Sequence, residues 1–169
     1  MQPKEAPAPQ MQPSRFEDSK SLRIAGLKQR LTNETMKDIS ALWQRFIPHF
    51  GKVPGQVGNI AYGLCSHLEV NPFSFDYLAG VEVSGNSKLP EGFSHVDIPA
   101  LRYAVFPHHD HVSKISQTVD AIWHRWLPSS GYAPIEANSD VPYMFERYGE
   151  GFNPQTETGD IEIWIPLQA

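Results

Sequence analysis

The sequence has little of several features that mark common protein classes. A single cysteine, Cys65, leaves no partner for an internal disulfide and no cysteine cluster for a structural zinc site, which fits a reducing compartment. No run approaches the ~18 uninterrupted apolar residues of a membrane span, and the amino terminus lacks the apolar core of a secretion signal. The sequence therefore predicts a cytoplasmic protein with no membrane partner.

Positive charge is also scarce. The chain carries 14 Lys and Arg against 19 Asp and Glu, so it lacks the basic excess that binding to a phosphate backbone requires. We therefore expect no direct contact with nucleic acid. The length of 169 residues fits one domain, and the 12 Gly and 15 Pro favour strands joined by turns over a helical bundle.

Residues 1–20 differ in composition from the rest of the chain. Phe16 is their only large apolar residue besides two methionines, and four prolines stand among glutamines and charged residues: Pro3, Pro7, Pro9 and Pro13. Such a segment buries too little apolar surface to fold by itself. The sequence predicts a disordered Pro/Gln-rich tail over 1–20 and one folded domain over 21–169.

An internal repeat organises this domain. Ala41–Pro48 aligns with Ala121–Pro128 at an offset of 80 residues, and both segments place an apolar stripe of helical spacing before a proline. The same offset lays Val81-Glu82-Val83 over Ile161-Glu162-Ile163. A period of this length that occurs only twice is unlike a solenoid. It predicts a duplicated unit, over about 21–90 and 91–169, in one pseudo-symmetric domain.

Each unit shows the order strand, helix, strand, strand. The predicted helices cover 34–50 and 113–128, and the predicted strands cover 22–32, 59–69, 73–84, part of 93–107, 142–149 and 160–167. Strands broken by two helices predict an α+β fold, in which an antiparallel sheet carries both helices on one side.

Four segments stand in a characteristic order within 21–169: Tyr103–His108, the helix end Trp123-x-x-Trp126-Leu-Pro, Phe145–Tyr148 and Ile161–Pro166. Together they resemble the GyrI-like, SHS2-type effector-binding domain of AraC- and MerR-type regulators, and in particular the stand-alone proteins associated with integron cassettes. The resemblance implies binding of bulky, hydrophobic, often cationic aromatic compounds around a central acidic residue. The sequence shows no helix-turn-helix segment before the domain, so we expect any regulatory role to need a partner regulator or a different readout. A homodimer is also among the expected partners.

Glu146 is the candidate acidic residue. Alternation along its strand puts Met144 and Tyr148 on its own face and Phe145 on the other. A carboxylate buried among apolar groups is either paired or retained for a function. One interpretation is that Glu146 attracts a ligand cation. The other is that it forms an ion pair at a wet sheet edge, with one of three arginines: Arg102, Arg125 or Arg147.

Aromatic side chains would complete such a site by stacking and cation–π attraction. The residues expected to bind ligand together with Glu146 are Tyr62, Tyr103, Trp123, Trp126, Tyr148 and Trp164. We expect no cofactor. We also expect no metal, because the histidines of His108–His111 have no accompanying Cys and no helix-borne His pair.

The sequence thus favours a receptor or sequestering protein for hydrophobic, cationic small molecules over an enzyme. Two alternatives stay open. Some GyrI-like domains hydrolyse strained, cyclopropane-containing toxins, and here Glu146 would be the general base with Tyr148 or Tyr103 as its partner. Others modulate DNA gyrase, which would make the tail or a sheet edge a surface for protein contacts.

Overall fold

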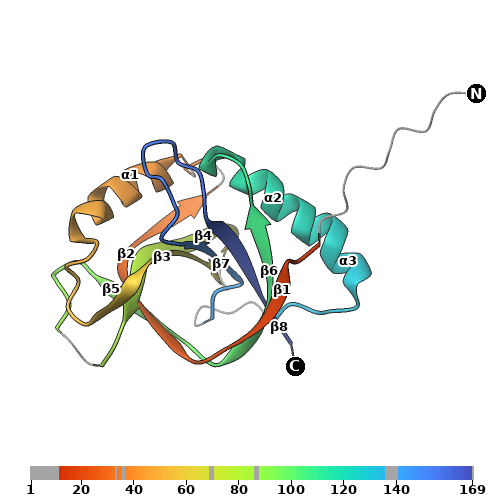
Figure 1. The fold of residues 1–169 in the computed structure, drawn as a ribbon, viewed down its shortest axis with the longest axis horizontal. Helices are drawn as coiled ribbons and strands as arrows, with labels where there is room; N and C mark the ends of the chain where they lie inside the picture. The colour runs from red at the N-terminus through yellow and green to blue at the C-terminus, as the bar shows by residue number, and fades with distance from the viewer. Residues whose placement is uncertain are drawn as a thin grey trace, which may run out of the picture.

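The computed structural model describes residues 12–168 except 33, 36, 69–70, 86–87 and 136–140. Its described part contains one antiparallel sheet in the order β1-β6-β8-β7-β3-β4-β2-β5 (Figure 1). The strands are β1 (Arg15–Ser19), β2 (Leu22–Thr32), β3 (Gln56–Leu68), β4 (Asn71–Val83), β5 (Ser94–Ile98), β6 (Leu101–His108), β7 (Met144–Tyr148) and β8 (Ile161–Leu167).

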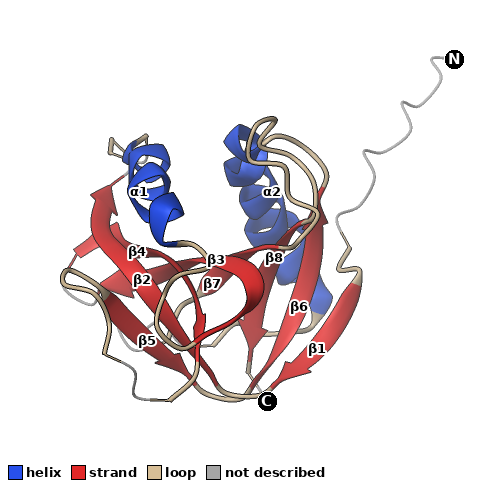
Figure 2. Ribbon diagram, turned by 60° about the vertical axis from the view of Figure 1, so that its left-hand side comes forward, coloured by secondary structure: helices blue, strands red, loops and turns tan. Residues whose placement is uncertain are grey.

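The helices lie together on one face of this sheet, as Figure 2 shows. Each turns an apolar stripe toward the strands, including Leu42 and Phe46 in the first helix and Ile122 in the second. The α+β prediction with both helices on one side is therefore confirmed. The helical segments are α1 (Asp38–Phe46), η1 (Ile47–His49), η2 (Val112–Lys114), α2 (Ile115–Ala121), the π-helical turn η3 (Ile122–Trp126) and α3 (Leu127–Ser130). None of the described helices is long and apolar enough to cross a membrane.

The order of the strands carries the duplication expected from the repeat. Reading outward from the central pair β7 and β3, β8 corresponds to β4, β6 to β2, and β1 to β5. Leu64 and Phe145 face each other across the central pair, so the pseudo-two-fold axis passes close to them. The two units therefore meet in the middle of one continuous sheet.

Strand β1 lies inside the segment that the sequence assigns to the disordered tail. It pairs with β6 of the second unit, while β5, about 80 residues later, pairs with β2 of the first. Each unit thus lends its first strand to the other. The ladder and a ring contact between Phe16 and Tyr132, with centroids 5.0 Å apart, order a segment too polar to predict as a strand. Residues 1–11 of the predicted tail lie outside the described residues.

The sheet buries apolar side chains on both faces. The helix face holds the larger cluster. Because the sheet curls (Figure 1), the opposite face encloses a second cluster without a helix to cover it, in which Phe145 and Trp164 stack at 5.3 Å. Neighbouring residues of β7 consequently point into two separate interiors.

Removing residues 1–19 should destabilise the domain, because it strips β1 from β6 and exposes that strand's edge. We expect the free energy of unfolding in urea to fall by at least about 2 kcal/mol, since several ladder hydrogen bonds are lost. Asp18→Asn, a change at an exposed position of β1, should stay within about 0.5 kcal/mol of the unaltered chain. Equal urea midpoints for the truncated and full chains would show that the exchanged strand is dispensable.

Candidate ligand-binding site

Glu146 lies in β7, between β8 and β3 at the centre of the sheet. It is only 7% exposed, and it shares the helix face with Met144 and Tyr148, as alternation along the strand predicts. The described residues form no ion pair with it, and the neighbouring Arg147 pairs instead with Glu162 on the opposite face. The interpretation of Glu146 as half of an ion pair at a wet edge is therefore wrong.

Two phenol hydroxyls hold the buried carboxyl. Tyr77 and Tyr148 each donate a hydrogen bond of 2.7 Å to Glu146 Oε1. Trp43 Nε1 in turn donates to the Tyr77 oxygen at 2.9 Å, so a relay of donors runs from α1 through β4 to β7. No described residue donates a hydrogen bond to Oε2. Both hydrogen bonds from the described residues therefore go to the same carboxylate oxygen.

Gly63 makes this arrangement sterically possible. It faces Glu146 across the pairing of β3 with β7. A Cβ at this position would collide with the Tyr77 hydroxyl and would lie 2.7 Å from Glu146 Oε1. Any side chain here would separate the phenol from the carboxyl, so the glycine is required by close approach.

The surroundings perturb the titration of all three groups. Burial raises the pKa of Glu146, and the hydrogen bonds from Tyr77 and Tyr148 offset only part of that rise. Burial, together with the nearby charge of Glu146, raises the pKa of both tyrosines well above its ordinary value. Both phenols therefore remain protonated donors, and the ionised carboxylate lacks a compensating positive charge.

Aromatic rings from both helices lie on the face of the sheet that holds the carboxyl. The ring of Trp43 lies 5.4 Å from that of Tyr148, which in turn lies 5.0 Å from Phe152. Toward the second helix, Trp123 contacts Tyr143 edge-on at 6.1 Å, and the Tyr143 side chain hydrogen-bonds the buried Cys65. We call this set the aromatic shell: Trp43, Tyr77, Trp123, Tyr143, Tyr148 and Phe152.

The residues that the sequence predicts for the site lie on two different faces of the sheet. Glu146 and Tyr148 are in contact on the helix face, and Trp123 lies on the same face, where it contacts Tyr143. Trp126 shares that face, but it packs against Phe106 at 4.9 Å and against Tyr132 at 6.0 Å. The remaining three belong to the cluster on the opposite face: Tyr62, Tyr103 and Trp164. For the hydrolase alternative, this leaves Tyr148 and not Tyr103 beside Glu146.

Sequence reasoning missed Tyr77 and Trp43. Tyr77 alternates with Ala79 and Val81 along β4, so its face could be foreseen, but its contact with Glu146 spans β3 and depends on Gly63. Trp43 has the helical spacing of an ordinary core residue. Only the packing of α1 over β4 gives its indole N–H a role in the relay.

The histidines of His108–His111 interact with other groups of the protein. Both ring nitrogens of His108 have hydrogen-bond partners, Thr118 Oγ1 at 2.7 Å and the His111 carbonyl oxygen at 2.8 Å. His111 pairs with Glu157 at 3.0 Å and caps the start of the second helix through Ser113. The described residues contain no group of three His, Cys, Asp or Glu side chains placed to hold a metal.

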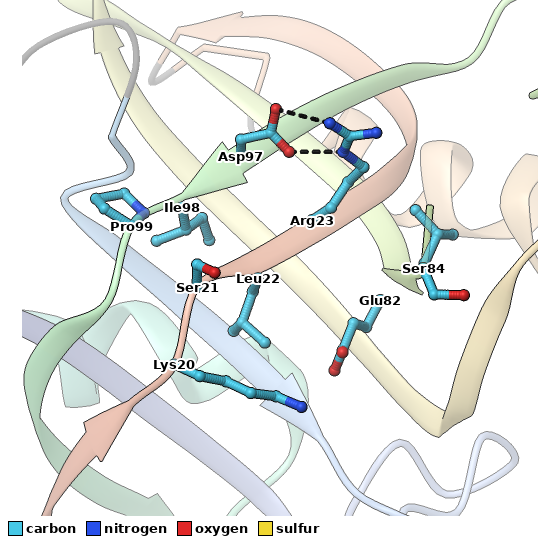
Figure 3. A pocket seen from close by; sticks show the side chains of 10 residues that line it. Lys20, Ser21, Leu22, Arg23, Glu82, Ser84, Asp97, Ile98 and Pro99 are labelled. Carbon is cyan, nitrogen blue, oxygen red and sulfur yellow. Dashed lines mark hydrogen bonds and ion pairs between the residues drawn. The ribbon is translucent and has the colours of Figure 1, made fainter. Parts of the chain in front are cut away.

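Two open grooves lie elsewhere on the protein. One, of about 500 Å³, is lined from β2, β4 and β5, and there Arg23 pairs with Asp97 at 2.7 Å (Figure 3). The other, of about 540 Å³, is formed by Phe16, Trp126 and their neighbours and has no charged residue in its lining. Glu146 borders neither groove.

Comparison with known proteins agrees with this architecture. The GyrI-like small molecule binding domain matches residues 12–168. The transcriptional regulator BrlR of Pseudomonas aeruginosa is 31% identical over 130 residues, which are 76% of this chain but 46% of BrlR. The chain thus spans about half the length of this curated relative.

Solved structures share the fold at lower sequence identity. The structure of SAV2435 bound to tetraphenylphosphonium has a TM-score of 0.71 and 20% identity, and the match covers 92% of this chain and 93% of the other. The integron cassette protein VCH_CASS2, from the mobile metagenome of Vibrio cholerae, has a TM-score of 0.64 and 18% identity, with coverages of 94% and 97%. The resemblance drawn from sequence segments is confirmed: this chain belongs to the family of GyrI-like small molecule binding domains.

Proposed function

We propose that the small molecules bound by this domain are hydrophobic aromatic cations and that Glu146 is their counter-ion. The observation that supports this is a buried carboxyl to which the described residues offer two neutral phenol donors and no positive charge. An ionised carboxylate in such surroundings is poorly stabilised. A ligand cation that approaches Oε2 would supply the missing charge.

The aromatic shell sets the kind of cation. Faces of Trp43 and Tyr148 next to the carboxyl would each contribute roughly 0.5 to 2 kcal/mol of cation–π attraction to a desolvated cation. The shell offers few acceptors to replace the water of a compact ammonium ion. Bulky, weakly hydrated cations with charge spread over rings are therefore favoured. That SAV2435, which shares the fold, was solved with tetraphenylphosphonium supports the same class of ligand.

We assign the ligand contacts to Glu146 and the aromatic shell. Tyr62, Tyr103 and Trp164 act from the opposite face in this proposal, where their rings pack against Phe145 and hold β7 in place. Trp126 contributes to the hydrophobic core beside β6. We further propose that a homodimer or a partner regulator responds to the occupied site.

A hydrolytic function is the second candidate, because the Tyr148 hydroxyl lies 2.7 Å from Glu146 Oε1. Glu146 would then take a proton from water while Tyr148 orients the reacting group. Burial raises the pKa of Glu146 by more than the hydrogen bonds from the two phenols lower it, so the carboxylate would be a stronger base than an exposed one. Incubation with a cyclopropane-containing electrophile, followed by mass spectrometry, separates binding from turnover. Ring-opened product that depends on Glu146 would favour the hydrolase.

The substitution Glu146→Gln should weaken binding of tetraphenylphosphonium by about 30-fold or more, because it removes a desolvated charge partner at nearly constant volume. Isothermal titration calorimetry measures the change directly. Glu162→Gln, the same substitution on the opposite face of the neighbouring strand, is the matched control and should leave the affinity unaltered. Equal affinities for Glu146→Gln and the unaltered protein would rule out the counter-ion role.

The pKa of Glu146 also predicts how stability depends on pH without ligand. Because the folded state raises this pKa above its ordinary value of 4.5, the native protein holds the proton more tightly than the unfolded chain does. The contribution of Glu146 to stability is therefore full below that value and declines as pH rises through the folded pKa. The melting temperature of the unaltered protein minus that of Glu146→Gln should decline over the same range of pH. A difference that stays constant from about pH 4 to pH 8 would contradict it.

A further inference from the structure

The two tryptophans at equivalent places in the repeat differ in their hydrogen bonding. Trp43 in α1 and Trp123 in η3 are 80 residues apart, and both pack on the helix face of the sheet. Trp43 Nε1 donates to the Tyr77 hydroxyl at 2.9 Å. Trp123 Nε1 is buried and has no hydrogen-bond partner among the described residues. Buried N–H groups are normally paired, so this one calls for an explanation.

The difference follows from the residues that the two units place at equivalent levels of the sheet. Across the axis at the Leu64–Phe145 pair, Cys65 on β3 corresponds to Glu146 on β7. Cys65 lies opposite Tyr77 on β4, and Glu146 lies opposite Ile163 on β8, so Ile163 stands where Tyr77 stands. The second unit therefore has no counterpart of the phenol that satisfies Trp43.

Trp123 nevertheless belongs to the surroundings of Glu146. Its ring contacts Tyr143, whose side chain hydrogen-bonds Cys65, the β3 residue directly opposite Tyr77 on β4. The charge of Glu146 reaches far enough to raise the pKa of both the Cys65 thiol and the Tyr143 hydroxyl, each of which is raised chiefly by burial. The orphan N–H thus lies in the same aromatic shell, on the side of the second helix.

We propose that Trp123 Nε1 is a specificity contact of the ligand site, donating a hydrogen bond to a neutral acceptor on the bound molecule. The inference rests on the proposed function, and it narrows the ligand class to aromatic cations that also carry a carbonyl oxygen, an ether oxygen or an unprotonated ring nitrogen at a distance from the charge. A cation without such an acceptor leaves the N–H unpaired in the complex. The site would therefore bind cations that carry an acceptor more tightly than cations without one, because only the former replace the missing hydrogen bond.

A pair of probes that differ in one group tests the proposal. (4-Benzoylbenzyl)trimethylammonium carries a ketone between its two rings, and (4-benzylbenzyl)trimethylammonium has a methylene in the same place. Isothermal titration calorimetry on the full chain should give an affinity about fivefold to tenfold higher for the ketone, the value of one neutral hydrogen bond. In Trp123→Phe the two probes should bind alike.

Two further variants separate this proposal from the function on which it rests. Trp43→Phe, the matched change on the first helix, should weaken both probes while keeping the preference for the ketone. Glu146→Gln should weaken both probes by a similar factor.

The outcomes then fall into two kinds. If the unaltered protein binds both probes equally, or if Trp123→Phe keeps the preference, the acceptor contact is wrong and the cation site stands. If neither probe binds, or if Glu146→Gln leaves the affinity for both probes unchanged, the proposed function is wrong and the acceptor contact is wrong with it. The comparison of probes in the unaltered protein decides the matter even if Trp123→Phe does not fold.

Discussion

The hydrogen bonds from Tyr77 and Tyr148 to one oxygen of Glu146 are the interaction on which the candidate site depends. They keep a carboxyl in the middle of a sheet, where burial opposes its ionisation. The bond from Tyr77 must cross β3, and it can do so only because Gly63 has no side chain. Trp43 then fixes the phenol from α1. Residues of α1, β4, β3 and β7 thus hold one acidic group in place.

The duplication repeats the fold of the two units, but it does not repeat the acidic residue. On β3, Cys65 stands where Glu146 stands on β7, one residue from the central Leu64–Phe145 pair and on the opposite side of it. Burial raises the pKa of the Cys65 thiol, which leaves a neutral group at the equivalent position. Of these two equivalent positions, only the one on β7 holds a carboxyl group. Under the proposed function, a bound molecule would meet an acidic group on one side only, although the fold around it repeats.

Sequence patterns foresaw the elements and the face of Glu146, but not the pairing between distant segments. Helical spacing and alternation report local geometry, so both helices, most of the strands and the shared face of Glu146 and Tyr148 were predictable. β1 was not, because the sequence Arg15–Ser19 becomes a strand only through its ladder with β6. Trp164 was expected to bind ligand together with Glu146, but it lies on the opposite face of the sheet. It faces Phe145 across β7 and β8, and that pairing is not written in either segment alone.

Glu146 and Glu162 show that surroundings, not residue type, make the site. They lie on adjacent strands and point to opposite faces. Burial acts on Glu162 as well, but hydrogen bonds from Arg15 and Trp164 and the charges of Arg15 and Arg147 outweigh it and lower its pKa. Glu146 has phenols where Glu162 has guanidinium groups, and its pKa moves the other way. A carboxylate already paired within the protein gains little from a ligand cation. The charge that β7 leaves uncompensated is the one that a cationic molecule can stabilise.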